Sequence, residues 1–144
     1  MANFIPSSPS STPTPAGKTA PWILLVDDEP PIRQLVDIVL RSQGFEIQVA
    51  ENAPAALALI NASAVPPALL ICDVVMPKTD GLALTRQLLS RLPGLKVLFI
   101  SGKLDDTAWW PADLAGIRLL AKPLDNAELI LAVKDALAEP GALT

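Results

Sequence analysis

A chain of 144 residues is long enough to bury one hydrophobic core without disulfides or a structural metal, so we expect one domain. Apolar residues make up 51% of it and charged residues 18%, the balance of a compact protein. The formal charge of −4, with scattered basic residues, argues against direct nucleic-acid binding. The absence of histidine excludes Ser-His-Asp and Cys-His catalysis, so any chemistry must use carboxylates, hydroxyls or lysines.

The composition changes along the chain. Residues 1–20 are rich in Pro, Ser and Thr and predict a disordered tail, because they bury too little apolar surface to order themselves. We expect the folded domain at residues 21–139 and a C-terminal stub at 140–144. Cys72, the single cysteine, lies in an apolar run and is expected to be buried. The apolar runs are shorter than the ~20 residues of a membrane helix, and the N-terminus does not resemble a signal peptide. We therefore expect a cytoplasmic protein without membrane insertion.

Short apolar runs alternate with helical patterns from Trp22 onward, as in an α/β fold whose parallel sheet is covered by helices on both faces. Five strands are predicted, all of them buried, at residues 22–26, 45–49, 69–72, 95–100 and 117–121. Apolar stripes at helical spacing predict helices that contain residues 32–40, 53–60, 84–92 and 130–137. A weaker fourth helix covers 104–115, where Pro111 interrupts the pattern. Asp125 is the predicted N-cap of the last helix, with Glu128 three positions on.

Polar residues follow the points where predicted strands end. Asp27 and Asp28 follow the first strand, Asp73 the third, Ser101 the fourth and Lys122 the fifth. Ligands of open parallel sheets bind at the carboxyl ends of the strands, so these side chains should meet at one edge. Three carboxylates at one edge repel one another unless a cation neutralises them, and Mg²⁺ suits carboxylate and phosphate oxygens. With an ammonium and a hydroxyl beside them, the pattern indicates phosphate chemistry.

Four motifs in the chain carry a resemblance to a known family. They are Ile23 to Pro30 (ILLVDDEP), Cys72 to Gly81 (CDVVMPKTDG), Ser101-Gly102 and Lys122-Pro123. In this order and spacing they resemble the receiver domains of two-component response regulators, similar to the chemotaxis response regulator, over residues 22–138. The resemblance implies a doubly wound, flavodoxin-like sheet with strand order 2-1-3-4-5, five helices and a cis bond between Lys122 and Pro123.

The resemblance also implies a phosphorylation site. Asp73 would accept phosphate from a phosphohistidine on a histidine kinase or a histidine phosphotransfer protein. Mg²⁺ would be held by Asp28, Asp73 and the backbone carbonyl of Val75, with Asp27 positioning the metal through a water. Lys122 and Ser101 would contact the phosphoryl oxygens. The chain would then be a signalling switch that catalyses its own phosphorylation and dephosphorylation, and not an enzyme with a separate substrate.

Further residues are predicted to control the lifetime of the phosphoryl group and the binding of a downstream partner. By resemblance, Val75 and Lys103 flank the path of the hydrolytic water and would set the lifetime of the phosphoryl group. Ser101 would be the switch hydroxyl, whereas the aromatic residue that often accompanies it is replaced here by Leu119. The downstream protein target would bind the face of the fourth helix, fifth strand and fifth helix. Within that fourth helix, one of the two adjacent rings of Trp109 and Trp110 would anchor a partner, or both would be only structural.

Two alternatives remain at this point. A phosphatase of the haloacid dehalogenase type also uses an aspartate nucleophile and Mg²⁺, but its Asp-x-Asp pair is missing from Asp27-Asp28-Glu29. A receiver-like module that only binds partners and is never phosphorylated would show no gain of mass with a phosphodonor.

Overall fold

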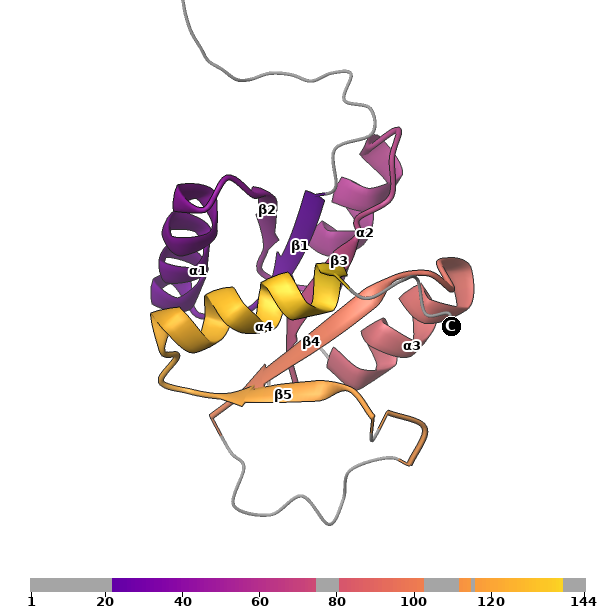
Figure 1. Ribbon diagram of the computed structural model, residues 1–144. Helices are drawn as coiled ribbons and strands as arrows, with labels where there is room; N and C mark the ends of the chain where they lie inside the picture. Colours follow the sequence, from indigo (N-terminus) through magenta and orange to yellow (C-terminus); the bar gives the residue numbers. More distant parts are fainter. Residues whose placement is uncertain (1–21, 75–80, 103–111, 115, 139–144) are drawn as a thin grey trace, which may run out of the picture.

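The computed structural model describes residues 22–74, 81–102, 112–114 and 116–138, which form a parallel sheet with helices on both faces (Figure 1). All four neighbouring strand pairs are parallel, and the strand order is β2-β1-β3-β4-β5. The predicted sheet and its order are therefore confirmed. The strands are β1 (Trp22–Val26), β2 (Glu46–Ala50), β3 (Leu69–Asp73), β4 (Lys96–Ser101) and β5 (Arg118–Ala121).

Four helices cover the sheet among the described residues: α1 (Pro30–Ser42), α2 (Ala53–Ala62), α3 (Gly81–Arg91) and α4 (Asn126–Ala138). Helices α1 and α4 lie on one face and α2 and α3 on the other (Figure 1). The weak helix predicted at 104–115 falls mostly outside the described residues, and its described part is the short 3-10 turn Ala112–Leu114. Helix α4 is thus the last of the five predicted helices. None of the described helices has both the length and the hydropathy needed to cross a membrane.

The core consists of two layers, one on each side of the sheet. Every residue of β1 and β3 is buried, because these central strands have neighbours on both sides and helices on both faces. Alternate residues serve the two layers: Ile23 and Leu25 pack toward α1 and α4, whereas Leu24 and Val26 pack toward α2 and α3. Cys72 is buried in the second layer, as predicted.

The prediction that all five strands are buried is wrong for the two edge strands. In β2, Glu46 is exposed and Val49 keeps 39% of its surface accessible. In β5, Arg118 and Ala121 are exposed. An edge strand has a neighbouring strand on one side only, so part of its surface stays in contact with water.

Helix starts follow the predicted capping rules in part. The Asp125 carboxylate accepts a hydrogen bond from the backbone N–H of Glu128 at 2.8 Å, which confirms the predicted cap of α4. Helix α1 begins with Pro30 and Pro31 in its first turn, but its N-cap residue, Glu29, makes no side-chain capping bond. The side chain of Glu29 is therefore available for another contact.

Asp125→Ala should lower the free energy of unfolding by about 1 kcal/mol, because it removes the acceptor for one of the free N–H groups at the start of α4. Asp125→Asn keeps an acceptor oxygen and should stay close to wild type. Urea denaturation of the three proteins measures the difference. Equal stability of the Ala and Asn variants would show that the cap contributes nothing.

Candidate functional site

The strand register brings the predicted polar residues together at the end of the sheet where the strands have their carboxyl ends. Asp27, Asp73, Ser101 and Lys122 each lie at the carboxyl end of a strand or one position beyond it, on four adjacent strands. The backbone N–H of Lys122 donates to the carbonyl of Ser101 at 2.9 Å, which continues the pairing of β4 and β5 beyond the last strand residue. The prediction that these four residues meet at the carboxyl ends of the strands is therefore confirmed.

Three of these side chains are buried although they are polar. Asp27, Asp73 and Ser101 are 0%, 1% and 1% exposed. A buried carboxylate costs free energy unless a cation or hydrogen bonds compensate for its lost hydration. Such a concentration of buried polar groups at the end of a sheet is typical of a functional site.

Lys122 supplies the positive charge next to these carboxylates. Its Nζ donates to Asp73 Oδ2 at 2.8 Å and to Glu29 Oε1, and it lies 3.2 Å from Asp27 Oδ2. Burial by itself would lower the pKa of Lys122, but the hydrogen bonds to Asp73 and Glu29 and the charges of Asp27 and Asp73 raise it above its ordinary value. Lys122 thus remains an ammonium at neutral pH.

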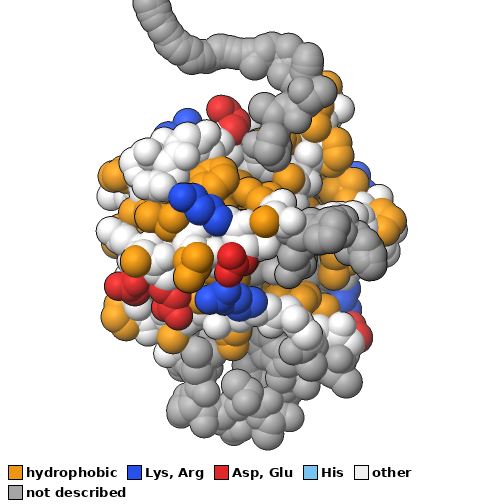
Figure 2. Space-filling model, in the orientation of Figure 1, with side chains coloured by type: hydrophobic (Ala, Val, Ile, Leu, Met, Phe, Trp, Pro, Cys, Tyr) orange, Lys and Arg blue, Asp and Glu red, His pale blue; other side chains and the backbone are white. Residues whose placement is uncertain are grey.

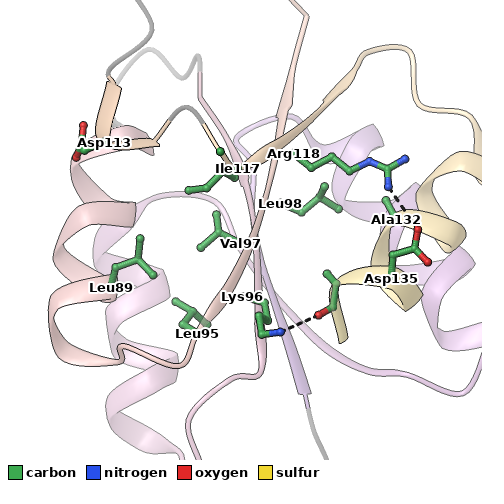
Figure 3. A pocket seen from close by; sticks show the side chains of 12 residues that line it. Leu89, Leu95, Lys96, Val97, Leu98, Asp113, Ile117, Arg118, Ala132 and Asp135 are labelled. Carbon is green, nitrogen blue, oxygen red and sulfur yellow. Dashed lines mark hydrogen bonds and ion pairs between the residues drawn. The ribbon is translucent and has the colours of Figure 1, made fainter. Parts of the chain in front are cut away.

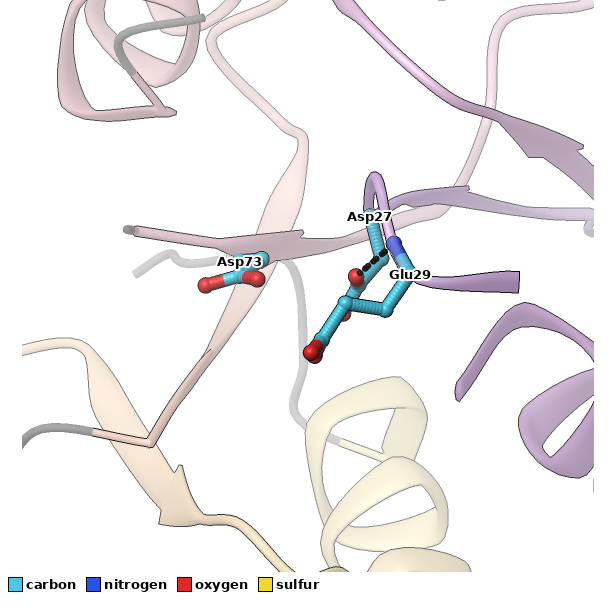
Figure 4. Close-up of side chains that lie close together, drawn as sticks. All are labelled: Asp27, Glu29 and Asp73. Atoms are coloured by element: carbon cyan, nitrogen blue, oxygen red, sulfur yellow. Dashed lines mark hydrogen bonds between the residues drawn. The ribbon is translucent and has the colours of Figure 1, made fainter. Parts of the chain in front are cut away.

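Asp27, Glu29 and Asp73 form an acidic cluster, in which one carboxylate oxygen of each lies within 4.8 Å of the others (Figure 4). Asp27 Oδ1 accepts the backbone N–H of Glu29 at 2.8 Å, while its buried Oδ2 accepts no hydrogen bond from the described residues. Burial raises the pKa of Asp27, and the neighbouring charge of Asp73 raises it further, against the opposing effects of the Glu29 N–H and Lys122. Several carboxylate oxygens, one of them without a donor, fit a hard cation such as Mg²⁺.

The sequence does not predict Glu29 as a member of the cluster, because the residue lies at the start of α1, three positions beyond the end of β1. The run of three acids directly after β1 was the available signal. Asp28, the ligand implied by the family resemblance, is half-buried and is not one of the three clustered carboxylates. Its role stays a prediction.

Several other predicted residues are not placed at the site by the structure. Val75, Lys103, Trp109 and Trp110 lie outside the described residues, as do the predicted tail and stub. Leu119, the predicted switch position, is half-buried in β5 and packs against the core layer of α2 and α3.

The Lys122-Pro123 peptide bond is cis, as the resemblance implies.

Gly81 fixes the distance between α3 and the end of β3. A Cβ atom at Gly81 would lie 2.3 Å from the backbone oxygen of Asp73 and 3.1 Å from Cys72 Sγ. Only a residue without a side chain permits this approach. The first residue of α3 therefore contacts the backbone of Asp73 directly.

A cleft of about 380 Å³ lies at the opposite end of the sheet, between α3 and α4 (Figure 3). Among its lining residues, Lys96 Nζ donates to the carbonyl of Ala136 at 3.2 Å, and Arg118 Nη1 lies 3.6 Å from Asp135 Oδ2. Its walls include the first residues of β4 and β5, whereas the acidic cluster lies at the carboxyl ends of the strands. The cleft therefore adds no group to the acidic cluster.

Asp27→Asn should raise the free energy of unfolding when no divalent ion is present, because it removes a buried charge and keeps an acceptor for the Glu29 N–H. Because the folded-state pKa of Asp27 is raised, wild type recovers this stability as the pH falls through that pKa, and the two proteins should converge. Urea denaturation in EDTA at several pH values tests both statements. A less stable Asn variant at neutral pH would contradict them.

Comparison with known proteins agrees with this geometry. Residues 23–134 match the response regulator receiver domain family. The chain is 32% identical over 124 residues to the probable transcriptional regulatory protein TcrX of Mycobacterium tuberculosis, which covers 85% of this chain and 52% of TcrX. It is 33% identical over 117 residues to the sensor kinase CckA of Brucella abortus, covering 80% of this chain and 12% of CckA. The crystal structure of the receiver domain of NtrX from Brucella abortus superposes with a TM-score of 0.73 at 36% identity, covering 82% of this chain and 99% of that domain.

The chain belongs to the response regulator receiver domain family, the signalling switches of two-component regulatory systems. The family match leaves the phosphatase alternative without support. The chain spans about half of TcrX and about an eighth of CckA, so the activities of those whole proteins do not transfer to it directly.

Proposed function

We propose that this receiver is phosphorylated on Asp73 and that phosphorylation changes its binding to a protein partner. The observation that carries the proposal is the placement of Asp73, buried at the end of β3 with Lys122 Nζ 2.8 Å from its carboxylate and Asp27 and Glu29 next to it. This arrangement supplies a nucleophile, a positive charge and a set of oxygen ligands at one edge of the sheet.

The chemistry follows from these groups. A carboxylate oxygen of Asp73 forms a bond to the phosphorus of a phosphohistidine on the donor protein, while the bond from phosphorus to the imidazole nitrogen breaks and the imidazole leaves. Lys122 holds one phosphoryl oxygen with its ammonium, and the hydroxyl of Ser101 donates to another. Asp73 and Asp27, with Asp28 or Glu29, would hold Mg²⁺, whose positive charge would offset the phosphoryl oxygens.

The same groups support self-catalysed phosphorylation and dephosphorylation, since phosphoryl transfer depends mainly on alignment and charge neutralisation. We further propose that Val75 and Lys103 set the phosphoryl lifetime. Val75 has no side-chain hydrogen bond to orient a water, so we expect slow loss of phosphate.

The partners belong to the same proposal. The phosphate donor would be a histidine kinase or a histidine phosphotransfer protein in the cytoplasm, and the domain would occupy residues 21–139. The downstream target would bind at β5 and α4 and at the helix predicted before β5, with Ser101 and Leu119 transmitting the change. On the face formed by α1 and α4, acidic and basic side chains lie among hydrophobic ones and do not form a basic patch, in line with protein and not nucleic-acid binding (Figure 2).

Intact-mass spectrometry tests the proposal. Incubation with acetyl phosphate and Mg²⁺ should add one phosphoryl group per chain, in an adduct that is stable in acid and labile in base. Removing Mg²⁺ with EDTA should abolish the adduct, because the uncompensated carboxylates repel the donor. A protein that gains no mass would instead support the binding-only module.

A further inference from the structure

In the unphosphorylated protein, Lys122 Nζ donates hydrogen bonds to Asp73 and Glu29 and forms an ion pair with Asp27. Asp27 and Asp73 are buried, and Lys122 itself has 14% of its side chain exposed. Glu29 differs, because 55% of its side chain is exposed. A phosphoryl group on Asp73 also needs a donor from Lys122, so at least one present contact must weaken. Glu29 is the partner that water can solvate at the lowest cost.

The backbone around Glu29 is fixed independently of its side chain. Its N–H donates to Asp27 Oδ1 at 2.8 Å, and Arg33 Nη1 donates to the backbone carbonyl of Asp27 at 2.7 Å. The side chain makes no capping bond to α1 and reaches the same edge as the carboxylates of Asp27 and Asp73 (Figure 4). A substitution at Glu29 therefore changes the contact to Lys122 while the turn and the helix start remain.

We propose that Glu29 is a positioning residue that holds the Lys122 ammonium in the unphosphorylated protein and competes with the incoming phosphoryl group for it. Glu29 then slows phosphorylation, both by engaging Lys122 and by adding negative charge where an anionic donor must approach. The inference rests on the proposed phosphorylation of Asp73 and adds a residue that controls its rate.

Two substitutions at Glu29 distinguish the effect of the side chain's length from the effect of its negative charge. Glu29→Gln keeps the length of the side chain and removes the charge, whereas Glu29→Asp keeps the charge and shortens the side chain by one methylene. Glu51→Gln is the matched control, because Glu51 is an exposed acid that follows β2 at the same edge and is not among the three carboxylates around Lys122. The rate constant of phosphorylation by acetyl phosphate at saturating Mg²⁺ is the first measurement.

Glu29→Gln should be phosphorylated about two- to fivefold faster than wild type, the effect expected from releasing a half-exposed ion pair. Glu29→Asp should also be faster than wild type, but by less, because it keeps the negative charge. Glu51→Gln should leave the rate constant unchanged. An equal rise in Glu51→Gln would assign the effect to net charge and overturn the proposal. A Glu29→Asp variant that behaves as wild type would do the same, because the reach of the carboxylate would then be irrelevant.

A second measurement does not depend on phosphorylation. In metal-free, unphosphorylated protein, the ¹⁵N-¹H signal of Lys122 Nζ should shift and its protons should exchange faster with water in both Glu29 variants, and not in Glu51→Gln. An unchanged signal would overturn the proposal. Mg²⁺ titration by calorimetry adds a third outcome: weaker binding in the Glu29 variants without faster phosphorylation would make Glu29 a metal ligand instead.

Failure of the proposed function remains distinguishable from failure of this inference. A wild-type protein that takes up no phosphate would overturn the phosphorylation of Asp73 and the competition with it. The Lys122 signal would still show whether Glu29 holds the ammonium.

Discussion

Asp73→Asn should abolish phosphorylation completely. The amide keeps the size of the side chain and its place at the end of β3, but its oxygen is a poor nucleophile and does not carry the charge that draws Lys122 to it at 2.8 Å. Loss of a nucleophile removes the reaction path itself, whereas loss of Lys122 or Ser101 would remove only part of the stabilisation of the phosphoryl oxygens.

Intact-mass spectrometry with acetyl phosphate and Mg²⁺ measures this result, and peptide mapping of wild type locates the modified residue. Asp135→Asn is a suitable control, because Asp135 lies near Arg118 on the exposed side of α4, away from the acidic cluster. The control should be labelled as completely as wild type. Any labelling of Asp73→Asn would mean that another side chain accepts the phosphate, with Asp27 and Glu29 the nearest candidates.

The sheet could be predicted well because its signal is local. The run at β1 is apolar throughout and that at β3 is apolar up to its last residue, Asp73, as in a strand covered on both faces, and the predicted bounds differ from the observed ones by at most one residue at each end. The edge strands were predicted too buried, since an apolar run gives no information about how many neighbours a strand has. Edge position follows from the order of all five strands, which the family resemblance implies but no single run contains.

The site could be predicted in part for a related reason. Asp27, Asp73, Ser101 and Lys122 each end a strand or directly follow one, so the topology of a parallel sheet is sufficient to bring them together at the carboxyl ends of the strands. Glu29 could not be assigned in this way. Its backbone belongs to the start of α1, and only the direction of its side chain, which capping rules would turn toward the helix, brings it to Lys122. The direction of a side chain at the start of a helix depends on contacts with distant parts of the chain, which the local sequence does not specify.

The acidic cluster also illustrates a conflict between stability and function. The fold buries Asp27 and Asp73 near one another, with Lys122 as the one ammonium that the described residues place beside both, and burial raises the pKa of Asp27. Groups arranged to receive a cation and a phosphoryl group remain under-compensated when neither is bound. A bound cation would offset this cost and stabilise the folded protein according to its concentration and affinity.

Gly81→Ala should cause the largest loss of stability among these substitutions, about 3 kcal/mol. Helix propensity by itself favours alanine over glycine by about 1 kcal/mol. The new Cβ, however, would lie 2.3 Å from the backbone oxygen of Asp73, and a backbone atom within the sheet cannot move aside as the end of a flexible side chain can. Overpacking of this kind typically costs about 1–3 kcal/mol, and a contact with backbone belongs at the upper end. The clash therefore outweighs the gain in propensity.

The substitution should also reduce phosphorylation, because either α3 or the end of β3 must shift and Asp73 belongs to the part that is displaced. Gly94→Ala provides the control, since a Cβ at Gly94 meets no atom within 4 Å and the residue does not require a positive φ. It should be as stable as wild type or slightly more stable, because alanine reduces the entropy of the unfolded chain. Urea denaturation of both variants gives the free energies, and the rate of labelling by acetyl phosphate gives the functional effect. A Gly81→Ala protein with the stability of wild type would show that α3 can move away from β3 without cost, and a normal labelling rate in that protein would show that Asp73 is positioned independently of α3.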